Sequence, residues 1–265
     1  GLQWEFVVEG LRRDRSFNRT SATITGRSAS ALLAAPYMPE RTWTNAFDMT
    51  AEQIAADVLA FTGVGLNWGI TDWNVPAGAW SFAGPPLAAV IKVAASAGAI
   101  VQSPRVGEAL SVQARYPVPP WEWAGETPDV TLALDPVMVE GYERADRPAY
   151  DGVYILGAAS GVSTLVKRTG SMPAMLKPMI TDPLITHVDA ARQRGIAELA
   201  PSGPVAVMTL TLPVLTGPSE PGVIDVGKLI LVDDPAGAWR ALVTAVAVRA
   251  NWPSVLQTLT VERHL

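Results

Sequence analysis

The sequence predicts an α+β fold that is mainly β, and three features indicate this class. Residues 205–265 contain four runs rich in Val, Leu, Ile and Thr that are separated by turn residues, as is typical of strands. Helical and strand patterns alternate between residues 50 and 115. A stretch dense in proline and tryptophan, YPVPPWEWAGETP, separates these regions. We expect the last four strands to form an antiparallel sheet that closes into a barrel or is covered by another element.

The chain opens with a predicted hairpin and a short helix. The expected elements are strands over 2–9 and 20–26, a polar turn over 11–18 and a helix over 29–35. Ser28 is expected to cap this helix, and Pro36 ends it. Because a sheet of two strands is marginal alone, its partners would come from upstream of Gly1 or from elsewhere in the fold. The chain lacks an initiator Met and opens in a strand pattern, so we expect a processed chain or a fragment.

A small α/β domain is predicted next. The expected elements are helices from Thr50 to Gly63 and over 84–98, and strands over 64–68, 99–102 and 109–115. Thr50 and Gln53 have the spacing of a capping box, in which each side chain bonds the other residue's amide. The predicted buried stripes are Ile54, Val58 and Phe61 on the first helix, and Leu87, Val90, Ile91 and Ala94 on the second.

The rest of the chain is predicted as a second β domain with one helix. Strands are expected over 130–134, 137–142, 151–156 and 162–167, an irregular stretch over 171–178, and a helix over 181–200 capped by Thr186 or Asp189. Gly195 is expected to weaken that helix by about 1 kcal/mol relative to alanine. The predicted domains are 1–36, 37–117 and 130–265, with a linker over 118–129.

Composition excludes several classes of function. Charged residues make up 17% of the chain, against about 25% in soluble domains, which fits either oligomer interfaces or a merely Ala-rich sequence. The net charge is −5 and no Lys/Arg-rich run is present, which argues against a nucleic-acid groove. The chain has no cysteine, so disulfides and Cys-based metal sites are excluded. No apolar run approaches the ~18 residues that span a bilayer, so we expect no membrane insertion.

Residues that could carry chemistry do not form a recognisable catalytic or metal pattern. His187 and His264 are the only histidines, and neither belongs to a zinc motif. Ser28 and Ser160 fall outside a G-x-S-x-G pattern. Asp233 and Asp234 are adjacent, so on a strand they would point to opposite faces, and a turn role explains them better. The sequence therefore predicts no enzyme, no cofactor and no metal.

The tryptophans in or beside loops are the candidate contact residues. Trp73, Trp80, Trp121 and Trp123, with Trp68 nearby, could pack between domains, anchor a protein interface or stack on sugars. We select Trp73, Trp80, Trp121 and Trp123 as candidate interface residues.

Several stretches together resemble the tail hub family of tailed phages, that is, the baseplate hub or late-control-type proteins that also occur in prophages and contractile injection systems. The resembling stretches are TITGRSASALL (23–33), FDMTAEQIAADVLAFT (47–62), residues 86–116, residues 180–200, residues 205–212, PGVIDVGKLILVDD (221–234) and LQTLTVERH (256–264). None of them is a catalytic signature, and it is their order along the chain that carries the resemblance.

The resemblance implies tube-forming antiparallel β-barrel domains, two per subunit, with a small α/β domain between them. It implies a homotrimer whose ring joins the six-fold tail tube to a three-fold spike or fibre. The implied partners are the tail tube or distal tail protein, the spike or fibre, and a tape measure protein. The implied location is the virion, assembled in the host cytoplasm. This chain begins inside the first barrel, which departs from a complete hub.

An acidic chain suits a lumen through which DNA passes without specific binding, because like charges repel. The alternative function is a carbohydrate- or receptor-binding module of a virion that uses the loop tryptophans. A polysaccharide hydrolase is disfavoured, because the sequence offers neither paired acids nor a Ser/His/Asp set.

Overall fold

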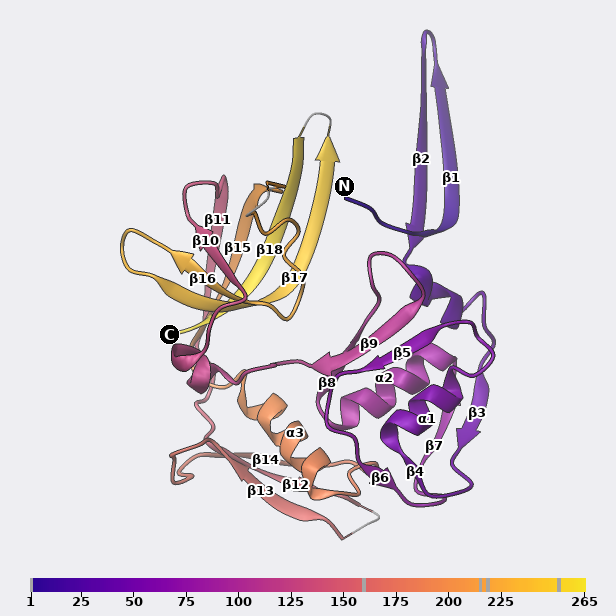
Figure 1. The fold of residues 1–265 in the computed structure, drawn as a ribbon, viewed down its shortest axis with the longest axis vertical. Coiled ribbons are helices and arrows are strands. Elements are labelled where there is room, and N and C mark those ends of the chain that lie inside the picture. Colours follow the sequence, from indigo (N-terminus) through magenta and orange to yellow (C-terminus); the bar gives the residue numbers. More distant parts are fainter. Residues whose placement is uncertain (1, 159–160, 215, 218–219, 252–253) are drawn as a thin grey trace. The chain divides into compact units, whose positions relative to one another are not determined.

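The chain folds into two compact units, each assembled from separate stretches of sequence (Figure 1). The computed structural model describes residues 2–158, 161–214, 216–217, 220–251 and 254–265. The first unit comprises Gly1–Ala114, Tyr154–Val166 and Met179–Gly195, and the second comprises Arg115–Val153, Lys167–Pro178 and Ile196–Leu265. Strands outweigh helices, so the predicted α+β, mainly β class is confirmed.

An α/β body dominates the first unit, with α1 and α2 packed beside a three-stranded sheet of order β5-β9-β8 (Figure 1). Its elements are β3 (Arg41–Thr44), β4 (Met49–Thr50), α1 (Ala51–Val58), β5 (Gly65–Trp68), β6 (Asn74–Val75), β7 (Ser81–Gly84), α2 (Pro86–Ser96), β8 (Ala99–Gln102) and β9 (Ala109–Ala114). Strand β9 pairs parallel with β5 and antiparallel with β8, while β3–β7 and β4–β6 form separate pairs. The apolar faces of both helices and of β9 are buried, as amphipathic patterns require.

The predicted capping box of α1 is confirmed. The Thr50 hydroxyl accepts from the Gln53 amide at 3.3 Å, and the Gln53 side chain accepts from the Thr50 amide at 3.0 Å. Two stripe residues were wrongly predicted as buried. Phe61 lies beyond the end of α1 at a φ of 63° with its ring fully exposed. Ile91 is exposed because α2 turns Val90, Val93 and Ala94 toward the core instead.

The chain starts with a long two-stranded hairpin, β1 (Val7–Ser16) and β2 (Arg19–Arg27), followed by the 3₁₀ helix η1 (Ala29–Leu33). The predicted polar turn over 11–18 is wrong, because β1 continues to Ser16 and the turn narrows to Phe17 and Asn18. Both faces of the hairpin are exposed, so its sequence lacks the alternation that marks a half-buried strand.

A small sheet and one helix contain segments of both units. They are β12 (Gly152–Leu156), β13 (Ser163–Lys167), β14 (Leu176–Thr181), with sheet order β13-β12-β14, and α3 (Val188–Leu199). The predicted helix over 181–200 starts too early. Residue Thr181 ends β14, and the Asp182 carboxylate then accepts from the Leu184 amide at 3.0 Å in a turn.

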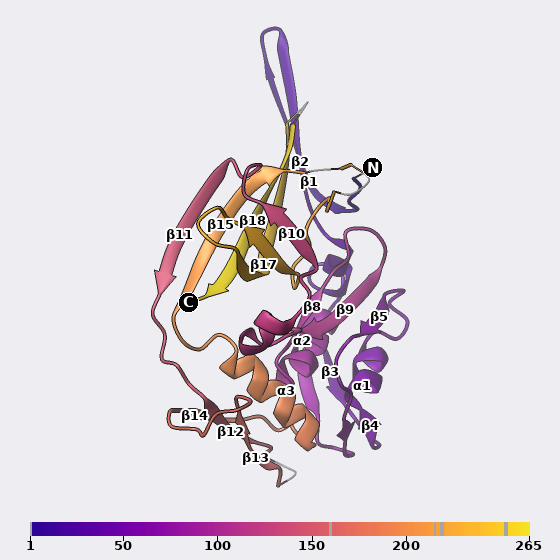
Figure 2. The same ribbon diagram turned by 60° about the vertical axis from the view of Figure 1, so that its left-hand side comes forward.

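The second unit is built on a six-stranded sheet of order β10-β16-β17-β18-β15-β11 (Figure 2). Its strands are β10 (Val130–Ala133), β11 (Val139–Ala145), β15 (Val205–Pro213), β16 (Leu229–Asp233), β17 (Trp239–Asn251) and β18 (Ser254–His264), preceded by the 3₁₀ helix η2 (Pro120–Gly125). All neighbours pair antiparallel except β10 and β16, which are parallel.

One face of this sheet encloses the core of the second unit. The buried side chains come from five of the six strands and include Leu132, Met208, Leu210, Ile230, Val243 and Leu259. A register shift between Val243 and Ala245 marks a bulge in β17, and bulges bend the strand that carries them. Within the described residues β10 and β11 form the two edges, so strand pairing gives an open sheet and not a closed barrel.

Candidate assembly surfaces

Three of the four candidate tryptophans are buried, and Trp121 is half-buried. Trp73 and Trp80 belong to the first unit, where the Trp73 indole donates to the Leu184 carbonyl at 2.9 Å. Trp123 is buried in the second unit and meets the His264 ring edge-on at 5.2 Å. Trp121 is half-buried, and the Arg168 guanidinium lies over its ring at 5.0 Å. Their role in an interface stays a prediction.

The β1–β2 hairpin is the most exposed element of the first unit. Leu11 and Ile24 stand directly opposite each other with 72% and 64% of their side chains exposed, and Phe17 at the turn is fully exposed. A lone two-stranded hairpin is marginally stable in water, and exposed apolar side chains on such an element are typical of a surface that binds a partner.

Polar contacts hold the base of the hairpin in place. The Arg27 guanidinium binds both oxygens of the Glu9 carboxylate at 2.6–2.9 Å and donates to the Ala35 carbonyl at 3.0 Å. The hydrogen bond from Arg27 is the main reason that the pKa of Glu9 lies below its usual value. Gly26 approaches the Val7 carbonyl so closely that a side chain there would strike it. The base is therefore anchored, while the outer part of the hairpin projects.

The hairpin is strongly basic in an acidic chain. Between Val7 and Arg27 there are five arginines and two acidic residues, whereas the whole chain has a net charge of −5. Arg27 pairs with Glu9, and Arg12 pairs with Asp14 at 3.1 Å. Arg13, Arg15 and Arg19 have no ion-pair partner within the described part of the chain.

Strand β11 is the exposed edge of the six-stranded sheet. Among the described residues it pairs only with β15, so its outer side has no strand partner there and can accept another strand. Val139 and Tyr142 are 60% and 58% exposed. Glu140 and Glu143 are exposed as well, and Arg144 is drawn to Asp146 at 2.9 Å. This edge thus combines apolar side chains with available negative charge.

A buried polar cluster joins the end of β18 to the start of the second unit. The Glu262 carboxylate accepts from the Tyr116 hydroxyl at 2.8 Å, lies 3.0 Å from His264 Nε2 and 3.6 Å from the Arg147 guanidinium. Burial acts to raise the pKa of Glu262, but the bonds from His264 and Tyr116 and the charge of Arg147 outweigh it and lower the pKa. Burial and the neighbouring carboxylate raise the pKa of Tyr116. The cluster therefore favours an ionised Glu262.

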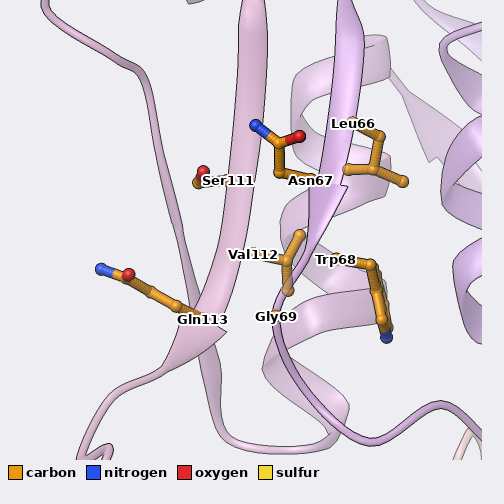
Figure 3. A pocket seen from close by; sticks show the side chains of 7 residues that line it. All are labelled: Leu66, Asn67, Trp68, Gly69, Ser111, Val112 and Gln113. Atoms are coloured by element: carbon orange, nitrogen blue, oxygen red, sulfur yellow. The ribbon is translucent and has the colours of Figure 1, made fainter.

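A hollow of about 360 Å³ lies over β5 and β9 of the first unit (Figure 3). Figure 3 shows Asn67, Ser111 and Gln113 on one side of these strands and Leu66 and Trp68 on the side of the helices. The Trp68 indole nitrogen and the Gln113 amide nitrogen are buried without a hydrogen-bond partner in the described residues. None of the four candidate tryptophans lines this hollow.

The other candidate residues have structural roles. His187 stands at the start of α3, where its Nδ1 accepts from the Asp189 amide at 3.3 Å, while the predicted cap Thr186 donates its hydroxyl to the Asn74 carbonyl instead. The Asp234 carboxylate closes a turn by accepting from the Ala236 amide at 2.8 Å, as expected. Ser28 precedes η1, but its hydroxyl meets Ser30 and makes no cap bond. Ser160 lies outside the described residues.

The described residues contain no group of three His, Cys, Asp or Glu residues arranged to hold a metal ion. Nor do they contain a helix that is long and apolar enough to cross a membrane.

No protein-family model matches the sequence, and no curated protein gives a significant match. The structure nevertheless shows the fold of phage and prophage tail proteins, which confirms the predicted resemblance at the level of fold. It is similar to the tail protein from Neisseria meningitidis MC58, with a TM-score of 0.63 and 13% identity over 97% of this chain and 79% of that chain.

It is also similar to the 43 kDa tail protein of prophage MuSo2 from Shewanella oneidensis, with a TM-score of 0.56 and 17% identity over 97% of this chain and 76% of that chain. A third relative in fold is the E. coli c3393 protein, a component of the type VI secretion system with structural similarity to the T4 bacteriophage tail proteins gp27 and gp5. Its TM-score is 0.50 at 15% identity, over 98% of this chain and 60% of that chain.

Proposed function

We propose that this chain is a structural component of a phage-type tail and has no enzymatic activity. Three copies form the hub ring that joins the six-fold tail tube to a three-fold spike or fibre. The observation that carries the proposal is the likeness in fold to two tail proteins, each over 97% of this chain. The exposed hairpin and the open edge of the six-stranded sheet support it, because both are surfaces suited to assembly.

In this proposal the four predicted segments have distinct places. Residues 1–36 contribute to the first β domain of the ring, and 130–265 form the second, whose curved sheet closes the tube with its neighbours. Residues 37–117 form the intervening α/β domain, and 118–129 link it to the second β domain. The partners are the tail tube or distal tail protein, the spike or fibre and a tape measure protein. The site of action is the virion, assembled in the host cytoplasm.

Mass in solution tests the proposal directly. Native mass spectrometry and light scattering over a range of concentrations should show a species of three times the 28.1 kDa chain mass. Electron micrographs of that species should show rings with three-fold symmetry. A chain that stays monomeric at every concentration would contradict the hub ring.

The alternative is a carbohydrate- or receptor-binding module that uses the loop tryptophans. Three of its four tryptophans are buried, and Arg168 already covers the ring of Trp121. A monomer whose tryptophan fluorescence is quenched by oligosaccharides in a saturable way would favour the alternative over the hub.

A further inference from the structure

The hairpin presents one face that combines apolar and basic side chains. Alternation along β1 places Leu11, Arg13 and Arg15 on the same face. Across from them on β2 stand Ile24 opposite Leu11 and Ala22 opposite Arg13. All of these residues are exposed. This face is therefore suited to a partner that offers both apolar contact and negative charge.

The exposed edge strand β11 offers those two properties. Val139 and Tyr142 supply apolar surface, and Glu140 and Glu143 supply carboxylates. Because successive residues of a strand face opposite sides, Glu140 and Glu143 lie on opposite faces of β11. An approaching strand pair thus meets negative charge on either face, while its backbone can bond the free edge.

We propose that the β1–β2 hairpin of one copy docks along the β11 edge of a second copy. The sheet then continues from one copy into the next, with Arg13 and Arg15 beside the glutamate on one face of β11. Arg19 stands opposite Ser16, on the other face of the hairpin, and lies beside the other glutamate. Complementary charge of this kind guides association and sets the register between partners. The proposal rests on the ring described above and names the contact that builds it.

A nucleic acid is the less suitable occupant of the basic hairpin. Phosphate backbones match arginines but leave the exposed apolar side chains Leu11, Ile24 and Phe17 in water. A protein edge with carboxylates and apolar residues covers both kinds of side chain.

Charge reversal with rescue is the first test. The triple variant R13E/R15E/R19E and the double variant E140K/E143K should each weaken trimer formation at least tenfold in sedimentation equilibrium. An equimolar mixture of the two should restore mixed trimers in part, because two of the three contacts in a mixed ring bring opposite charges together, while the third joins two copies of the same variant. The matched control is Arg192→Glu, a reversal at an exposed arginine of α3, which should leave assembly unchanged.

Crosslinking is the second test, and the absence of cysteine from the wild-type chain makes each introduced thiol unique. Chains carrying Leu11→Cys, mixed with chains carrying Val139→Cys and treated with a short bis-maleimide, should give a covalent dimer that joins one chain of each kind. A pair made of Phe61→Cys and Val139→Cys should not, although Phe61 is fully exposed. The crosslinker reports proximity and tolerates a small difference in strand register. It therefore tests the contact independently of the charge-reversal variants.

The outcomes separate this contact from the ring itself. The contact is overturned, and the hub stands, if the wild type and both charge-reversal variants form the trimer equally well and the Leu11→Cys and Val139→Cys chains give no crosslink. A wild-type chain that remains monomeric overturns the hub, and the contact with it. A hairpin that binds double-stranded DNA, and loses that binding in R13E/R15E/R19E without any change in assembly, also overturns the contact.

Discussion

At the scale of single residues, Gly195 shows how the environment can reverse a helix propensity. Glycine weakens a helix by about 1 kcal/mol relative to alanine, so propensity alone predicts that Gly195→Ala stabilises α3. A Cβ at this position, however, would lie only 2.5 Å from the Cβ of Val166. Strand β13, which carries Val166, packs so closely against α3 that this position has no room for a side chain.

We therefore expect Gly195→Ala to lower the free energy of unfolding by about 1–3 kcal/mol, as overpacking does. Urea unfolding followed by circular dichroism measures the change. Adding Val166→Ala should relieve only part of this loss, because alanine removes both Cγ atoms of Val166 but keeps the Cβ that lies 2.5 Å from the new methyl group. Gly125→Ala is the control, because a Cβ there meets open space.

Glu262 is a second residue with a testable consequence. Because its pKa is lowered in the folded chain, its ionised form stabilises the fold above the ordinary glutamate value of 4.5, and this contribution is lost as the pH falls below it. Glu262→Gln should reduce the free energy of unfolding at pH 7 by about 1–3 kcal/mol through the loss of charge-assisted bonds.

The variant should also lose less stability than the wild type between pH 6 and about pH 3, because it lacks the titrating group. Urea unfolding at several pH values measures both effects. Glu108→Gln serves as the control, as Glu108 is exposed. Parallel pH profiles for wild type and Glu262→Gln would show that this carboxylate does not couple folding to pH.

At the scale of elements, the start of α1 depends on a reciprocal cap. Thr50→Ala should lower the free energy of unfolding by about 1 kcal/mol, because it leaves the Gln53 amide without its acceptor. Gln53→Ala removes the other bond of the box. A double-mutant cycle over the two positions should give a non-zero coupling energy, measured by thermal or urea unfolding, whereas strict additivity would mean that the two bonds do not cooperate.

Elements with one buried and one exposed face were predictable from sequence. The alternation of buried and half-buried residues in β15, and the burial of Ile54 and Val58 on α1, follow directly from burial on one side. The exposed hairpin was misread because neither face is buried, so Leu11 to Ser16 show no alternation. Part of β14 was missed because Pro178 within it favours an irregular stretch.

The candidate surface was less predictable than the fold. Tryptophans were selected because large aromatic side chains anchor interfaces, but Trp73, Trp80 and Trp123 fill the interiors of their own units. The exposed residues, such as Leu11 and Val139, are ordinary in type, and only the pairing of strands shows that they stand on an uncovered hairpin and at a sheet edge.

At the scale of the whole molecule, charge is distributed unevenly. The hairpin is basic, and the net charge of −5 means that the remainder is more acidic than the total indicates. In the proposed ring the hairpin arginines form ion pairs with carboxylates of the neighbouring copy. The remaining surface charge is negative, so the assembled surface repels DNA.

We expect the assembled protein to leave linear double-stranded DNA unretarded in a mobility-shift assay at an ionic strength of about 0.15 M. Lys228→Ala should not change this, because Lys228 is already paired with Asp129 at 2.9 Å. Retardation of DNA by the wild-type trimer would contradict a lumen that lets DNA pass without binding.

The parallel pairing of β10 with β16 also sets an order of events during synthesis. Val130 of β10 pairs with Ile230 of β16, and β11 pairs with β15. Strands β10 and β11 therefore leave the ribosome long before their partner strands are synthesised. Such long-range pairing slows folding and leaves unpaired, aggregation-prone strand edges exposed until the partner strands are made. A chain that stops after Leu199 should aggregate when expressed, while the full chain stays soluble. The nascent protein therefore spends an interval with unpaired strands in the cell, and its yield should rise when chaperones that bind unpaired strands are abundant.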